Sequence, residues 1–198
     1  MASPELPRLG VFGGSFNPIH IGHLILAERA VEELRLDKVL FVPNAVSPLK
    51  SAETYVSGRD RLAMVRAAIR GNRRFEALDD EIRRGGASYT FDTVRALSDR
   101  TSAKLYFLIG TDAVADLDRW HRARELARMV TFALFRRPGS LGAQPPPWAG
   151  GWVEVAAPLI EISSSEIRDR IRSGRSVRYL VPDAVAAILR KRRLYRSP

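Results

Sequence analysis

The stretch Gly13-Gly14-Ser15-Phe16-Asn17-Pro18-Ile19-His20-Ile21-Gly22-His23 decides the fold of this chain. It follows a short apolar run, residues 9–12, which predicts a strand that stops at the two glycines. Beyond it, apolar residues three or four positions apart predict a helix that opens near His20 (Leu24, Ala27, Val31 and Leu34). Glycines let a backbone approach a ligand closely, and a helix start turns its positive dipole end toward an anion. The stretch therefore predicts a phosphate-binding turn.

Apolar strands and amphipathic helices alternate along the rest of the chain. Strands are predicted at 38–42, 75–78, 105–109 and 129–135, and helices at 58–69, 90–97 and in the region that ends at Leu126. Continuous apolar strands separated by helices predict an α/β fold, with a parallel sheet covered by helices on both faces. The carboxyl ends of such strands lie on one edge of the sheet, where ligands bind. The C-terminal portion is predicted to be helical, with Pro182 beginning its last helix.

Length and composition indicate one folded domain, residues 1–198. The 45% hydrophobic content is ordinary for a globular protein, and the Gly- and Pro-rich segment 138–151 is interpreted as an irregular insert rather than a domain boundary. The chain has no cysteine, which excludes disulfide frameworks, thiolate zinc sites and cysteine nucleophiles. No apolar run approaches the roughly 20 residues of a membrane-spanning helix, and no signal peptide is indicated. A cytoplasmic location is expected.

The net charge of +10 is concentrated near the C-terminus. Residues 163–198 include ten Arg or Lys and only three Asp or Glu. This basic segment is either a solvated helix surface or a nucleic-acid-binding surface, and in the second case affinity would fall steeply with salt. A nucleic-acid-binding protein would not need the ordered motifs, so no obligatory nucleic-acid partner is expected.

His20 and His23 are three residues apart at the predicted helix start, so both rings lie on one helical face and can donate hydrogen bonds to a phosphate. A zinc site is disfavoured because the only other histidine is His121 and the spacing is not i, i+4. The glycines do not form GxGxxG, and the chain has no GxxxxGK[ST]. A dinucleotide oxidoreductase and a P-loop NTPase are therefore both disfavoured.

A second helix start is predicted at Ser163-Ser164-Ser165-Glu166-Ile167-Arg168, where Ser163 and Glu166 fit a capping box. Its amides and hydroxyls, with Arg168 one turn in, form a second candidate phosphate site. Glu166 is expected to turn back toward its own cap. No GxSxG sequence surrounds the serines, so a hydrolase nucleophile is not indicated.

The two motifs together, G-x-F-x-P-x-H-x-G-H and I-S-S-S-x-x-R, resemble those of the nucleotidyltransferase superfamily. Within it, the chain resembles the bacterial nicotinate-nucleotide adenylyltransferases over nearly its whole length. Further segments fall in that family's order: Phe41-Val42-Pro43-Asn44, Arg61-Leu62-Ala63-Met64, Ser88-Tyr89-Thr90, Gly110-Thr111-Asp112, Trp120, Arg136-Arg137-Pro138 and Leu194-Tyr195. The resemblance implies a Rossmann-like fold and AMP transfer from ATP to nicotinic acid mononucleotide, with Mg²⁺ and without a covalent intermediate.

The resemblance also implies site residues. Catalysis would fall to His20, His23 and Arg168. ATP would be bound by these three residues together with Gly13, Gly14, Ser15, Phe16, Gly110, Asp112, Ser164 and Ser165. The mononucleotide would be bound by Asn44, Lys50, Tyr89, Thr90, Asp112, Trp120 and His121, with Trp120 stacked on the pyridine ring. No residue is expected to hold a resident metal.

One departure concerns the mononucleotide phosphate. The family usually has Pro-His-Lys or Pro-His-Arg where this chain has Pro48-Leu49-Lys50, so Lys50 is left as the expected anion ligand. Adenylyl transfer to phosphopantetheine or to nicotinamide mononucleotide is the alternative. The His20-Ile21-Gly22-His23 spelling also resembles class I aminoacyl-tRNA synthetases, but the chain is short and lacks a KMSKS-like loop. A homo-oligomer is left open.

Overall fold

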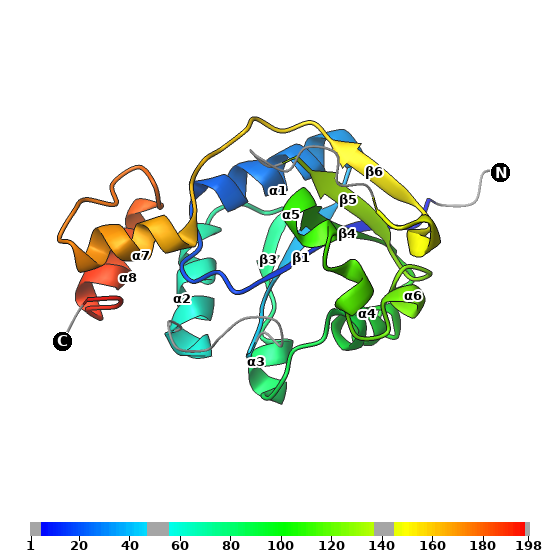
Figure 1. Cartoon of the computed structure of the whole chain (residues 1–198), viewed down its shortest axis with the longest axis horizontal. Coiled ribbons are helices and arrows are strands. Elements are labelled where there is room, and N and C mark those ends of the chain that lie inside the picture. Colours follow the sequence, from blue (N-terminus) through cyan, green and yellow to red (C-terminus); the bar gives the residue numbers. More distant parts are fainter. Residues whose placement is uncertain (1–4, 47–55, 137–144, 197–198) are drawn as a thin grey trace.

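The computed structural model describes residues 5–46, 56–136 and 145–196, and a six-stranded sheet forms its centre (Figure 1). The strand order is β3-β2-β1-β4-β5-β6, and every neighbouring pair is parallel. The strands are β1 (Arg8–Gly14), β2 (Lys38–Pro43), β3 (Phe75–Ala77), β4 (Lys104–Gly110), β5 (Thr131–Phe135) and β6 (Trp152–Val155). The chain adds β2 and β3 on one side of β1 and then returns to its other side with β4. Sheets of this kind bind ligands beyond the carboxyl ends of the strands at such a reversal.

Helices connect the strands and cover the sheet. In the described residues they are α1 (Ile21–Leu34), α2 (Gly58–Ala68), α3 (Asp80–Arg84), α4 (Thr90–Ser98), α5 (Thr111–Val114), α6 (Ala123–Leu126), α7 (Ser164–Arg172) and α8 (Asp183–Lys191), with short 3₁₀ turns at Leu117–Arg119 and Pro147–Ala149. None of the helices in these residues is long and apolar enough to span a membrane.

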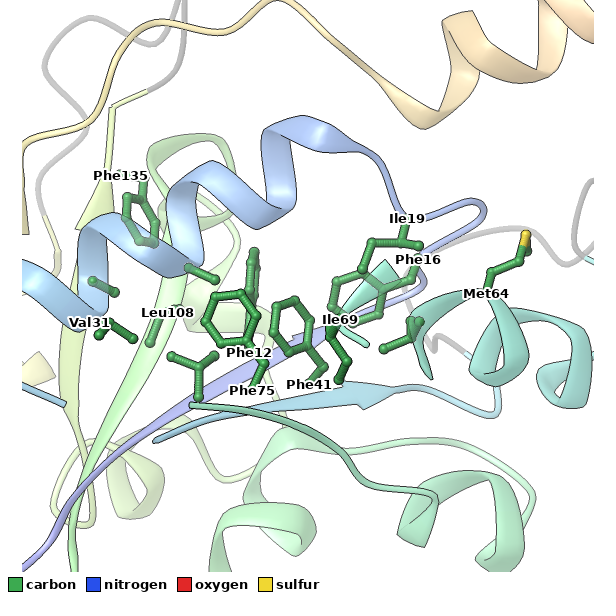
Figure 2. Packing of buried hydrophobic residues seen from close by; sticks show 14 of the residues in the cluster. Phe12, Phe16, Ile19, Val31, Phe41, Met64, Ile69, Phe75, Leu108 and Phe135 are labelled. Carbon is green, nitrogen blue, oxygen red and sulfur yellow. The ribbon is translucent and has the colours of Figure 1, made fainter. Parts of the chain in front are cut away.

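The core has two parts because successive strand residues point to opposite faces of the sheet. Val11 packs with Phe107 and the helices on one face. The next residue, Phe12, packs on the other face with Phe41 and Phe75, beneath α1 (Figure 2). The apolar strands therefore carry a hydrophobic core on each side, as an all-parallel sheet requires.

α7 and α8 lie together at one end of the molecule, beside the start of α1 and beside α2 (Figure 1). α8 packs against α2 and buries Val185 and Leu189. Arg192, which follows α8, forms an ion pair with Asp60 in the first turn of α2. The helical C-terminal portion was predicted, and Pro182 is the residue immediately before α8.

The predicted α/β fold, a parallel sheet with helices on both faces, is confirmed, and three details of the sequence prediction are wrong. β5 begins at Thr131 rather than at Met129, because the Met129 N–H donates to the Leu126 carbonyl and continues the turn after α6. A sixth strand, β6, follows β5 along the chain and was not predicted. The short helix α3 was also missed.

Candidate active site

The loop between β1 and α1 crosses the carboxyl edge of the sheet at the strand-order reversal. Gly13 and Gly14 end β1, and a Cβ on Gly14 would lie only 3.4 Å from the Phe16 ring. Phe16 has φ +45° and turns its ring into the core, where it packs edge-on against His23 with 5.1 Å between ring centroids. The loop backbone, rather than the Phe16 side chain, is therefore what faces a ligand.

His20 and His23 lie side by side at the start of α1, as predicted. Their ring centroids are 3.7 Å apart, and His20 is buried. The His20 N–H donates to His23 Nδ1 at 3.2 Å, and the His23 N–H donates to the His20 carbonyl at 3.0 Å. Because Nδ1 of His23 accepts a hydrogen bond, neutral His23 carries its proton on Nε2. This arrangement makes Nε2 the N–H donor of that ring.

The first amide of α1, that of Ile21, is not open to a ligand. Its N–H donates to the Leu180 carbonyl at 3.0 Å, so the segment between α7 and α8 closes over that position. A ligand at this helix start would therefore not be bound by the Ile21 amide.

The serine-rich start of α7 docks directly on this loop. The Ser164 hydroxyl donates to the Pro18 carbonyl at 2.8 Å, and Arg168 Nη1 donates to the Asn17 carbonyl at 2.9 Å. The other terminal nitrogen of Arg168, Nη2, donates to the Ser165 hydroxyl at 3.0 Å. Two helix starts that are more than 140 residues apart in sequence thus meet at one place.

The predicted capping box of α7 is only half present. Ser163 Oγ accepts from the Glu166 N–H at 3.1 Å, which caps the helix. The Glu166 carboxylate lies 3.9 Å from Arg170 Nη1 rather than over the cap. An ion pair one turn along the helix therefore directs this carboxylate, and the prediction for its side chain is wrong.

Arg61 links the β1–α1 loop to the segment that follows β2, a role that was not predicted from the sequence. Its side chain is 1% exposed and donates to the carbonyls of Ser15, Asn44, Ala45 and Val56 and to Asn44 Oδ1, at 2.7 to 3.2 Å. The sequence did carry a signal, because Arg61 lies on the helix face that also carries the apolar residues Leu62 and Val65. An arginine on such a face is expected to be buried, and a buried arginine needs several hydrogen-bond acceptors.

Two further residues that sequence reasoning left without a role are Asn17 and Tyr195. Asn17 is 0% exposed, and its Oδ1 accepts from the Tyr195 hydroxyl at 2.6 Å and from the Val56 N–H at 3.4 Å. Burial raises the pKa of the Tyr195 phenol well above its usual value, with the nearby charges of Arg168 and Arg61 acting in the opposite direction. Nothing in the local sequence marks this contact.

A second group of predicted residues lies past β4, toward α4. The rings of Tyr89 and His121 lie against each other, tilted by 39°, with 4.5 Å between centroids. Trp120 is half-buried, with its ring edge-on to Phe107 at 5.7 Å between centroids. Thr90 is the first residue of α4 and follows Tyr89 directly. Tyr89 and His121 thus form one aromatic pair, and Trp120 packs on the sheet through Phe107.

The backbone ties this group to the first loop. The Asn44 N–H donates to the Gly14 carbonyl at 3.0 Å, and the Ala45 N–H donates to the Ser88 hydroxyl at 2.8 Å. Gly110 ends β4 next to β1, and Asp112 is exposed in the first turn of α5. Lys50 and Leu49 lie outside the described residues, so the predicted lysine contact stays a prediction.

Comparison with known proteins matches this chain to one family of nucleotide-transferring enzymes. A family model described as cytidylyltransferase-like matches residues 11–170. A probable nicotinate-nucleotide adenylyltransferase of Geobacillus kaustophilus is 41% identical over 189 residues, covering 95% of this chain and 86% of the relative. Another protein of that description, from Exiguobacterium sibiricum, is 43% identical over 190 residues and covers 95% of this chain and 98% of the relative.

The fold is shared with solved structures. Nicotinic acid mononucleotide adenylyltransferase of Plasmodium falciparum, complexed with NaAD, superposes with a TM-score of 0.79 at 17% identity, covering 96% of this chain and 97% of that chain. A putative nicotinate-nucleotide adenylyltransferase of Vibrio parahaemolyticus gives a TM-score of 0.70 at 20% identity, with 98% of each chain covered. At these identities the likeness concerns the fold.

Proposed function

Because this chain belongs to the cytidylyltransferase-like family, and within it to the nicotinate-nucleotide adenylyltransferases, we propose that it transfers AMP from ATP to nicotinic acid mononucleotide. The products are nicotinic acid adenine dinucleotide and pyrophosphate, and the reaction belongs to NAD biosynthesis. The observation that carries the proposal is the docking of the α7 start on the histidine loop, through Ser164 and Arg168.

The reaction is a direct in-line displacement. An oxygen of the mononucleotide phosphate forms a bond to the α-phosphorus of ATP, the bond from that phosphorus to the bridging oxygen breaks, and pyrophosphate leaves with the oxygen. The protein supplies alignment and charge stabilisation and forms no covalent intermediate with the nucleotide. A site rich in hydrogen-bond donors suits this chemistry.

The donors have separate tasks in this mechanism. His20 and His23 stabilise the charge that grows on the α- and β-phosphate oxygens, with Nε2 of His23 as an N–H donor. Arg168 and the Ser165 hydroxyl bind the departing pyrophosphate, and Arg168 is held for this role from two sides. The Ser164 hydroxyl donates its proton to the Pro18 carbonyl and therefore anchors the start of α7 instead. The loop backbone from Gly13 to Phe16, together with Gly110 and Asp112, borders the rest of the ATP.

Mg²⁺ enters this site as part of the ATP complex. In residues 5–46, 56–136 and 145–196, no three or more His, Asp or Glu side chains gather in a way that could hold a metal ion. Mg²⁺ commonly binds through substrate phosphates and one or two carboxylates while keeping several waters. An ion bound to the ATP phosphates would neutralise charge on the leaving group.

The acceptor nucleotide lies over the aromatic group. Trp120 stacks on the pyridine ring, while Tyr89, Thr90 and His121 line the surrounding wall, and Asn44 faces the mononucleotide phosphate. The half-buried position of Trp120 supports this, because its edge is fixed by Phe107. Lys50 is the second proposed phosphate ligand.

The activity requires no nucleic acid and no membrane, and we place it in the cytoplasm within one domain. The test is pyrophosphate release from ATP and Mg²⁺ with three acceptors side by side: nicotinic acid mononucleotide, nicotinamide mononucleotide and phosphopantetheine. We expect the acid mononucleotide to give the highest kcat/KM and a product with the mass of nicotinic acid adenine dinucleotide. No turnover with either mononucleotide would defeat the proposal, and turnover with phosphopantetheine alone would replace it. A measurement of solution mass on the same sample gives the oligomeric state.

A further inference from the structure

The last turn of the described chain returns to the catalytic loop. Tyr195 follows α8, has φ +61° and is half-buried. Its hydroxyl donates to Asn17 Oδ1 at 2.6 Å across 178 residues of sequence. A hydrogen bond this short, to a fully buried amide, fixes the Asn17 side chain in one orientation.

Asn17 is in turn the residue that holds Arg168. Its main-chain carbonyl accepts from Arg168 Nη1 at 2.9 Å, while its side-chain oxygen accepts from Tyr195 and from the Val56 N–H. The position of Asn17 therefore sets one of the two hydrogen bonds that orient the guanidinium, and the other comes from Ser165.

The Tyr195 hydroxyl remains a donor under all ordinary conditions. Burial raises the pKa of the phenol well above its usual value, so the group keeps its proton throughout the neutral and mildly alkaline range. The contact consequently acts as a fixed strut rather than as a proton donor in the reaction.

We propose that Tyr195 is a positioning residue for adenylyl transfer: its hydroxyl fixes Asn17, and the Asn17 carbonyl thereby aims Arg168 at the departing pyrophosphate. The inference rests on the proposed function. In the described residues the Tyr195 hydroxyl contacts Asn17 Oδ1, and Asn17 holds Arg168, so its effect belongs to the displacement step and to pyrophosphate binding.

A purely structural role for this hydroxyl is separable from a positioning role. α8 is already held by the buried side chains of Val185 and Leu189 and by the ion pair between Arg192 and Asp60. Removal of one oxygen atom from Tyr195 leaves those contacts and the ring in place. The fold is therefore retained in Tyr195→Phe, and the change falls on the geometry of the loop.

Tyr106→Phe is the matched control. The Tyr106 hydroxyl accepts one hydrogen bond, from Arg8 Nη2 at 2.7 Å, and its residue is 8% exposed. Arg8 begins β1, so this pair lies at the amino edge of the sheet, opposite the candidate active site. Both variants lose one tyrosine hydroxyl that takes part in a hydrogen bond, but only the Tyr195 hydroxyl lies beside the β1–α1 loop.

The experiment measures steady-state kinetics with ATP and nicotinic acid mononucleotide, and binding of inorganic pyrophosphate by calorimetry. We expect Tyr195→Phe to lower kcat by roughly tenfold to a hundredfold. A mutation far from the reacting atoms that displaces a catalytic group by about 1 Å can lower the rate by about 10²-fold. The KM for the mononucleotide should stay within about twofold, the affinity for pyrophosphate should fall, and Tyr106→Phe should change neither kcat nor pyrophosphate affinity by more than about twofold.

The path through Arg168 has its own test. In an Arg168→Ala background, Tyr195→Phe should lower kcat by less than about twofold more, because residues that act through one another are not additive. A second full loss in that background, an unchanged kcat in Tyr195→Phe alone, or an equal loss in Tyr106→Phe would each overturn the inference. Failure of the proposed function is distinguished by the wild-type protein: it would show no turnover with the mononucleotide, whereas the pyrophosphate affinities of the variants would still report on Arg168.

Discussion

Replacement of Arg61 by lysine is expected to destabilise this protein strongly even though the charge is kept. The Arg61 guanidinium is buried and donates five hydrogen bonds to five oxygen atoms, which belong to the β1–α1 loop, to the segment after β2 and to Val56, two residues before α2. A lysine ammonium has three donors on one atom, and it is more strongly hydrated than a guanidinium. At least two of the five oxygens therefore lose their donor.

The magnitude follows from those two lost hydrogen bonds. A buried polar group left without its partner costs about 1–3 kcal/mol, so the free energy of unfolding should fall by about 4 kcal/mol. For a chain of this size, 1 kcal/mol corresponds to about 2–4 °C in Tm, which gives a drop of about 8–16 °C. This is a large share of the 5–15 kcal/mol that stabilises an ordinary domain.

The assay is urea unfolding followed by circular dichroism, with Arg66→Lys as the control. Arg66 lies on the same helix, but its side chain is exposed and reaches only the Asp79 carboxylate, at 3.3 Å. The control should stay within about 0.5 kcal/mol of the wild type. If Arg61→Lys also lost less than about 1 kcal/mol, the reasoning about unsatisfied carbonyls would be refuted.

Three further outcomes are expected. His20→Ala should lower kcat by about 10²-fold or more, because loss of one preorganised donor to developing charge costs about 2.7–4 kcal/mol; near-normal turnover by a folded variant would contradict the role given to His20. Trp120→Ala should raise the KM for nicotinic acid mononucleotide more than the KM for ATP, and equal losses would leave the ring with a packing role only. The hydrogen bond from Ser57, joined by the contact with Arg192, holds the pKa of the Asp60 carboxyl below its ordinary value of about 3.9. The unfolded chain then binds more protons than the folded one in this range, so stability should fall as the pH drops below about 4, and urea midpoints between pH 3 and pH 6 should show a shallower fall in Asp60→Asn than in the wild type.

The sheet and its order along the chain were largely predictable because β1, β2, β4 and β5 each contain a continuous run of apolar residues. β6 was missed because only Val155 of its four residues is buried, so the edge strand has no apolar run to recognise. α3 is five residues long, which is too short to establish a helical period.

The candidate site divides in the same way. The histidines and the serine-rich helix start could be named from the sequence, because the residue types and the local helix signals occur together within a few positions. The roles of Arg61, Asn17 and Tyr195 could not, because their partners are distant in sequence. Arg61 on a helix face that also carries Leu62 and Val65 was a signal, but it identified neither Ser15 nor Asn44 as the acceptors.

The sequence alone determined the order of the apolar strands, the two helix starts and the choice of donors to a phosphate. Each of these depends on residues within about a turn of one another. The folded arrangement alone decided that the amide of Ile21 is taken by Leu180, that Arg168 is held by Asn17, and that Tyr195 closes over the same loop. These contacts depend on the positions of α7 and α8 against the β1–α1 loop and α2. That position results from burying whole helix faces, and no local pattern of residues specifies it.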